Sequence, residues 1–210
     1  MKAADHFLTI TKHHILVRKL CFKVGLYRQG LLHDLSKYSP TEFLMGCRYY
    51  QGDRSPNNAE REATGVSTAW LHHKGRNRHH FEYWVDYSLD DEHIIMGARM
   101  PRKYVAEMVM DRISASRTYM KDRYTSSAPL RYYLQGKEKL WFIERHTSKE
   151  LEGLLRILDR YGEEMLIRYI RYGYLRGISW KTFKKAGGNP SFLKQMQKNA
   201  RTVTETPEQI

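Results

Sequence analysis

Ten histidines are spread unevenly along the chain, and several stand next to residues with which they could bind a metal ion. His33 is followed directly by Asp34, so that one short segment supplies an imidazole and a carboxylate. Neighbouring residues of a helix point about 100° apart, and both side chains can reach one ion only where a helix ends or turns. This combination of ligands suits Mn, Fe, Co, Ni or Zn better than Ca. The pair therefore predicts a site for one or two divalent transition metal ions.

Asp111 lies among apolar residues in a segment with a strong helical pattern. Tyr104, Met108, Asp111, Ala115 and Tyr119 recur at helical spacing and share one face. A carboxylate buried on such a face is costly unless a cation or hydrogen-bond donors satisfy it. An arginine salt bridge would do so. With the histidines elsewhere in the chain, however, Asp111 is predicted to be a metal ligand.

Two histidine doublets flank a short basic segment; they are His72-His73 and His79-His80. Gly75 and Asn77 between them disfavour a continuous helix, so we expect a loop. His72 and His73 are predicted as metal ligands, and His79 and His80 as further ligands or catalytic residues. A solvated loop whose histidines only form hydrogen bonds is the alternative.

Cations near these histidines could hold an anionic substrate. Three lie between the doublets and one follows the His-Asp pair; they are Lys74, Arg76, Arg78 and Lys37. We expect them to bind a phosphate group, although an exposed lysine often has no such role. Glu82 is predicted to hold a ligating imidazole in its metal-binding tautomer.

The order of these residues resembles the HD-domain superfamily: a histidine on a first helix, a His-Asp pair, further histidines, and an aspartate on a later helix. The resemblance implies an all-helical metal protein, in most members a phosphohydrolase. It places the first ligand at His14, with His13 as the alternative, and the others at His33, Asp34 and Asp111. Members with two metals use the intermediate histidines as well.

Three segments also resemble a family of uncharacterised bacterial and phage proteins classed as a domain of unknown function. They are GLLHDLSKYSPTEF (30–43), WLHHKGRNRHHFEYW (70–84) and EMVMDRISAS (107–116). The resemblance covers residues 5–165 and supports the HD-like interpretation, but it implies no particular substrate.

The hydrophobic pattern is helical almost throughout and predicts an all-α fold, an HD-like bundle with additional C-terminal helices. Helices are expected over 5–24, 26–35, 39–50, 60–73 and 101–120, from 129, and over 147–162. Capping boxes are predicted at Ser39-Pro40-Thr41-Glu42 and at Thr147-Ser148-Lys149-Glu150.

Three regions are expected along the chain: a metal-binding helical domain over 1–165, a basic aromatic extension over 166–200, and a disordered tail over 201–210. The stretch 168–201 contains no acidic residue and mixes cations with rings, the ingredients of nucleic-acid contact. Rings in such a pattern more often simply pack against the domain.

Bulk properties restrict the class of protein. Lys and Arg number 36 against 23 Asp and Glu, a net charge of +13 that attracts anions. Two cysteines are too few for a disulfide scaffold, and no secretory signal or membrane-spanning run is found. A cytoplasmic protein is expected.

These features favour a metal-dependent hydrolase of the HD type that cleaves a phosphate ester, such as a nucleotide or another small phosphorylated substrate. Two alternatives remain open at this point. One is an HD-type di-iron oxygenase, which would use the same ligands. The other is a non-enzymatic nucleic-acid-binding protein that would use the basic extension.

Overall fold

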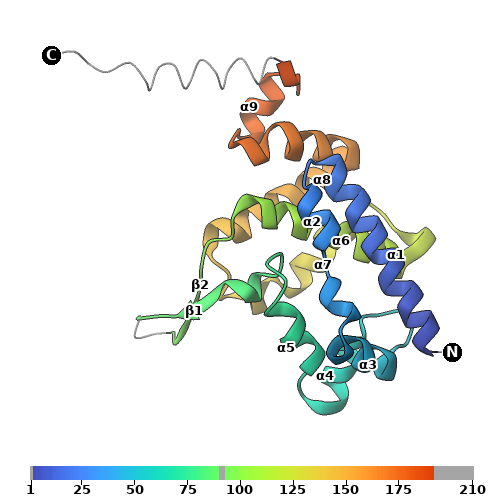
Figure 1. Cartoon of the computed structure of the whole chain (residues 1–210). Coiled ribbons are helices and arrows are strands. Elements are labelled where there is room, and N and C mark those ends of the chain that lie inside the picture. Colours follow the sequence, from blue (N-terminus) through green and yellow to red (C-terminus); the bar gives the residue numbers. More distant parts are fainter. Residues whose placement is uncertain (1, 90–92, 192–210) are drawn as a thin grey trace.

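The computed structural model describes residues 2–89 and 93–191, and most of them are helical (Figure 1). The α-helices are α1 (Lys2–Lys23), α2 (Tyr27–Leu32), α3 (Pro40–Tyr49), α4 (Pro56–Thr64), α5 (Thr68–Lys74), α6 (Arg102–Met120), α7 (Ala128–Gly136), α8 (Arg145–Tyr172) and α9 (Trp180–Lys185). Short 3-10 helices join them: η1 (Leu35–Tyr38), η2 (Phe81–Trp84), η3 (Lys121–Arg123), η4 (Lys137–Leu140) and η5 (Tyr174–Arg176). The prediction of an all-α fold is confirmed.

The middle of helix α6 is covered on all sides. Residues 105–110 are all buried, which requires neighbours around the whole circumference of the helix. Helices α1, α7 and α8 provide them. Full burial of an apolar side chain such as Val109 or Met110 contributes about 1.5–3 kcal/mol. The core therefore fixes the part of α6 that carries Glu107 and, one turn later, Asp111.

Helix α1 turns one apolar stripe towards α2 and α6. Ile10, Val17 and Leu20 are buried in this stripe, and His13 is buried between them at the matching helical spacing. The predicted end of the first helix is close to the observed one, because Gly25 follows α1 with a left-handed backbone. His13 is thereby directed into the protein.

Helices α3, α4 and α5 gather at one end of the molecule, where α3 packs against both others (Figure 1). The prediction of one helix over 60–73 is wrong. Gly65 ends α4 with a φ of +80°, and α5 begins after Ser67, whose side chain accepts the N–H of Trp70. The shorter α5 carries the first histidine doublet.

Neither predicted capping box forms. The Ser39 side chain makes no capping hydrogen bond at the start of α3, and Glu42 instead bonds histidines of α5. Helix α8 begins two residues earlier than expected, because the Glu144 side chain accepts the N–H groups of His146 and Thr147.

A short antiparallel hairpin was not predicted. Strands β1 (Val85–Tyr87) and β2 (Ile95–Gly97) pair with Asp86 opposite Met96, and the hairpin projects from one side of the molecule (Figure 1). Each strand has only three residues, too few for an alternating pattern to be recognised in the sequence.

The C-terminal region shares the core of the rest of the chain. Helix α8 was expected to stop near Gly162; it changes direction there, where Gly162 has a φ of 79°, and continues to Tyr172. Beyond the kink, Leu166, Ile170 and Phe183 are buried in the same hydrophobic cluster as α6. The predicted disordered tail, 201–210, lies outside the described residues.

Among the described residues, no helix combines the length and apolarity needed to cross a membrane. Cys21 is buried and Cys47 partly buried, and both are free thiols.

Candidate metal centre

The His-Asp pair sits at a break between two helices. Helix α2 ends at Leu32, and η1 begins at Leu35. Asp34 has a left-handed backbone (φ 53°, ψ 23°), a conformation that aspartate tolerates better than most residues. Because the chain turns here, the side chains of His33 and Asp34 escape the 100° separation of a helix and point to the same place. A backbone conformation of this kind in a non-glycine residue is often found at functional sites.

A first group of donors comes from α1, the α2–η1 break and α6. Nε2 of His13 lies 3.0 Å from Oδ1 of Asp111, and Nε2 of His33 lies 3.6 Å from the same oxygen. Oδ2 of Asp34 lies 3.3 Å from Nε2 of His33 and 3.9 Å from Nε2 of His13. Atoms of all four side chains lie within 4.8 Å of one another, close enough to bind a single ion.

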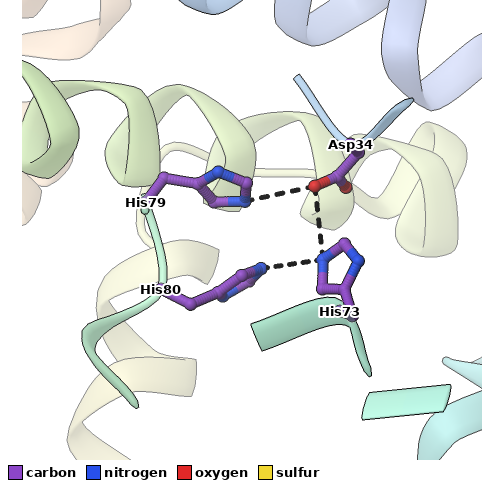
Figure 2. Close-up of side chains that lie close together, drawn as sticks. All are labelled: Asp34, His73, His79 and His80. Carbon is purple, nitrogen blue, oxygen red and sulfur yellow. Dashed lines mark hydrogen bonds and ion pairs between the residues drawn. The ribbon is translucent and has the colours of Figure 1, made fainter. Parts of the chain in front are cut away.

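Figure 2 shows a second group of donors, in which histidines face the other carboxylate oxygen of Asp34. Oδ1 of Asp34 is 3.2 Å from Nε2 of His73 and 3.3 Å from Nε2 of His79. Nε2 of His80 is 3.0 Å from Nε2 of His73. The chain turns back after α5 and brings His79 and His80 close to His73. A loop between the two doublets was expected from the sequence.

Asp34 belongs to both groups, and its two oxygens divide between them. Oδ2 faces His13 and His33, whereas Oδ1 faces His73 and His79. The residue is only 2% exposed, so its charge is withdrawn from water. A carboxylate in this position can bridge two cations.

The donor atoms have the environment expected of metal ligands. Four of the donor atoms are buried and have no hydrogen-bond partner, although other polar atoms lie close to them: Nε2 of His13, of His33 and of His79, and Oδ1 of Asp34. Buried polar atoms are normally hydrogen-bonded. Ligands about 2.1 Å from one ion lie about 3.0 Å apart in octahedral and about 3.4 Å apart in tetrahedral geometry. Close approach without hydrogen bonds therefore fits donors arranged around cations.

The carboxylates of the two groups are held in their charged form. Burial acts to raise the pKa of Asp34, but His33 and Lys37 outweigh it and keep this pKa well below its usual range. For Asp111 the same opposition of burial is outweighed by His13 and His33. Divalent cations would stabilise these carboxylates in the same way.

Two imidazoles are held neutral by the same surroundings. Burial, reinforced by Lys37, lowers the pKa of His13, and burial with the neighbouring His79 and His73 lowers that of His80. A neutral imidazole keeps the lone pair that a metal needs. At His33 and His73 burial acts to lower the pKa, but Asp34 outweighs it and raises the pKa of both rings, so that a cation at Nε2 would displace their protons.

Two glutamates contact Nδ1 of histidine rings in the two groups. Oε1 of Glu107 is 3.0 Å from Nδ1 of His33, and Oε2 of Glu42 is 2.8 Å from Nδ1 of His73. A carboxylate at Nδ1 fixes the tautomer that leaves Nε2 free for a metal. This role was expected of Glu82, which bonds no imidazole: its Oε2 is buried without a partner, and burial raises its pKa.

Sequence patterns gave weak signals for both glutamates. Glu42 satisfied a capping-box pattern, which concealed its long-range contact. Glu107 lies four residues before Asp111, and this spacing on one helix face is the feature that could have identified it.

Two predicted ligands fall outside both groups. The resemblance favoured His14, but the structure places His13 among the donors, because His13 continues the buried stripe of α1 whereas His14 lies at its edge and packs edge-on against Tyr38. His72 is also outside; its Nδ1 lies 2.6 Å from Oε1 of Glu42. The remaining predicted ligands, His33, Asp34, His73, His79, His80 and Asp111, are brought together.

The predicted anion-binding cations are placed differently from one another. Lys37 reaches the centre, with Nζ 2.6 Å from Oδ2 of Asp34 and 29% of its side chain exposed. Arg76 is exposed and donates to the carbonyl of His72. Arg78 is exposed and donates to the hydroxyls of two tyrosines. Lys74 is partly buried.

The rings of the basic extension pack rather than face solvent. Tyr169, Tyr174 and Phe183 are buried, and Tyr172 and Trp180 pack against the same core. In the described part of the extension these rings contribute to the fold, and stacking on bases would require them to leave it.

A model of a protein family described as "Family of unknown function (DUF5662)" matches residues 2–157. No match was found among curated proteins or among solved structures.

Proposed function

The chain belongs to the family of unknown function DUF5662, and from the geometry of its buried donors we propose that it is a metal-dependent phosphohydrolase of the HD type. The observation that carries the proposal is the position of Asp34, whose oxygens face two separate groups of buried histidines. Pairs of metal ions held in this manner are a recurring arrangement in enzymes that displace groups at phosphorus.

The first ion would be held by His13, His33, Asp34 and Asp111, and the second by Asp34 with three histidines of α5 and the following loop, His73, His79 and His80. Imidazole with carboxylate is a donor set for Mn, Fe, Co, Ni or Zn. Such ions supply Lewis acidity towards a phosphoryl oxygen and a water nucleophile at neutral pH.

Substrate would approach on the side of Lys37 and Asp111. Their side chains are 29% and 16% exposed, whereas those of His33, His73 and His79 are at most 2% exposed. The ammonium group of Lys37 is positioned to offset negative charge on a phosphate group at this opening. Lys74, Arg76 and Arg78 are proposed as more distant contributions to the attraction of an anion.

His72 is the doublet histidine that both donor groups leave free. Its side chain is 19% exposed, and Glu42 holds its Nδ1. In the proposed reaction it is the candidate general acid, which would give a proton to the leaving alcohol.

The test is metal analysis of the purified protein, followed by a screen for phosphate release from nucleotides and small phosphate esters with the identified ion. We expect bound transition metal and metal-dependent release of phosphate. Asp34→Ala and Asp111→Ala should lose metal and activity together while remaining folded.

Two outcomes would contradict the proposal. Unchanged metal content in well-folded Asp34→Ala and Asp111→Ala variants would show that the metal is not bound at the proposed centre. Protein that holds two irons and consumes oxygen during turnover, without releasing phosphate, would identify the oxygenase alternative.

A further inference from the structure

Glu107 contacts histidines of both donor groups through a single oxygen. The residue is 5% exposed and lies on α6, one turn before Asp111. Its Oε1 is 3.0 Å from Nδ1 of His33 and 3.3 Å from Nδ1 of His79. His33 belongs to the first group and His79 to the second. The same carboxylate oxygen therefore contacts Nδ1 of one proposed ligand of each candidate ion.

This contact determines which ring nitrogen of each histidine is free. A neutral imidazole carries one N–H, and when Nδ1 donates to a carboxylate the lone pair remains on Nε2. Nε2 of both His33 and His79 is buried without a hydrogen-bond partner. The two rings lie side by side, with centroids 4.3 Å apart, so that one acceptor can reach both.

Glu42 makes a similar contact but serves one group. It is 6% exposed and bonds Nδ1 of His73 at 2.8 Å and Nδ1 of His72 at 2.6 Å. Only His73 belongs to a donor group. Glu42 and Glu107 are thus two buried glutamates that each face two imidazoles, and they differ in how many candidate ions those imidazoles serve.

We propose that Glu107 is a positioning residue shared by two metal sites, so that its carboxylate sets the affinity of the chain for both ions at once. The inference rests on the proposed two-metal centre and adds the coupling between its halves. Because α6 provides both Glu107 and the ligand Asp111, its burial in the core fixes the position of this shared carboxylate.

Removal of the carboxylate should weaken both sites. Substitution of a group that supports a metal ligand typically lowers metal affinity 10–100-fold. For Glu107→Ala we expect about this loss of affinity for each of the two metal ions. For Glu107→Gln we expect a smaller loss for each ion, because the amide oxygen still accepts the Nδ1–H groups. Glu42→Ala should lose affinity for one ion only.

The experiment titrates the metal-free full-length chain with Co²⁺, following its visible absorption bands and measuring bound cobalt by equilibrium dialysis. Glu60→Gln is the control for loss of a buried carboxylate elsewhere, since Glu60 bonds Ser67 and Thr68 at the start of α5. It should bind cobalt as the wild type does. Circular dichroism establishes that each variant is folded, and Glu107→Gln keeps the measurement decisive if Glu107→Ala does not fold.

The outcomes separate this inference from the proposal on which it rests. The inference is supported if the Glu107 variants bind both Co²⁺ ions more weakly and Glu42→Ala binds only one of them more weakly. A wild type that binds two Co²⁺ and Glu107 variants that bind only one or neither of them more weakly would overturn the coupling alone. A folded wild type that binds no cobalt would overturn the metal centre and the coupling with it.

Discussion

Nε2 of His13 lies 3.0 Å from Oδ1 of Asp111, an ion-pair contact that does not have the geometry of a hydrogen bond. The two residues come from α1 and α6, which pack against each other in the core. Buried polar atoms such as Nε2 of His13 are normally hydrogen-bonded. Two ligands of one cation do lie this close without a hydrogen bond, because the ion holds each of them at the metal–ligand bond length. The packing of α1 on α6 is therefore part of the proposed metal site.

The neighbouring residues His13 and His14 provide a matched pair for a first prediction. His13→Ala removes a proposed direct ligand of the first ion, so we expect that ion to be lost and the second retained. His14→Ala should keep both, because His14 belongs to neither donor group. Elemental analysis of the purified variants measures this directly. Loss of metal in His14→Ala with full content in His13→Ala would restore the ligand that the resemblance favoured.

A second prediction concerns Lys37. Lys37→Met removes the cation beside Asp34 while keeping much of the side-chain volume. With the substrate found in the phosphatase screen, we expect kcat to fall about 10²–10³-fold, the usual effect of losing one charge-stabilising donor. Metal content should stay at two ions, since Lys37 is not a ligand. Unchanged kinetics with full metal content would exclude Lys37 from the reaction.

Residue types and spacing predicted most of the residues that the structure gathers in the candidate metal centre. The His-Asp pair, the doublets and Asp111 are recognisable because a carboxylate among apolar residues and clustered imidazoles are unusual in a sequence, and the structure brings members of each together. Choosing between His13 and His14 required more, namely which edge of the α1 stripe becomes buried. That depends on the packing of α2 and α6, which local periodicity does not specify.

The contacts of Glu42 and Glu107 could not be predicted from local sequence patterns. Glu42 and Glu107 act through contacts with residues distant in the chain, and such contacts leave no local pattern. The helices were largely predictable from periodicity and from residues such as Gly25. The helix starts were less so: the cap of α8 is Glu144, a residue outside the usual set of N-cap side chains.

A third prediction tests the packing of α3 on α1. A Cβ atom at Gly46 would collide with the ring of His6, which is buried and packs against the rings of Phe43 and Tyr50. Gly46→Ala should therefore destabilise the protein by about 1–3 kcal/mol in urea unfolding. In the His6→Ala background the same change should cost much less. Equal costs in both backgrounds would contradict this contact.

A fourth prediction concerns pH and the Glu144 cap. Burial opposes ionisation of Glu144, but hydrogen bonds from the backbone and side chains of His146 and Thr147 together outweigh it and lower its pKa to about 2. A pKa that is lower in the folded than in the unfolded state stabilises the fold above the unfolded value of about 4.3. This contribution is lost as the pH falls towards 2.

Urea unfolding of Glu144→Ala and wild type at several pH values measures the effect. At pH 7 we expect the variant to be less stable by about 0.5–2 kcal/mol, the usual cost of losing a cap. The difference should shrink as the pH falls from 4.5 to 2.5. A difference that stays constant over this range would show that the charge of Glu144 does not act at the helix start.

The central claim is that Asp34 lies between two metal ions, and anomalous X-ray diffraction tests it most directly. Crystals of the protein loaded with the metal found by elemental analysis would be measured at the absorption edge of that metal. We predict two anomalous peaks, one on each side of the Asp34 carboxylate. One should lie among His13, His33 and Asp111, and the other among His73, His79 and His80. No peak beside Asp34, or a peak bound instead by His14 or His72, would contradict it.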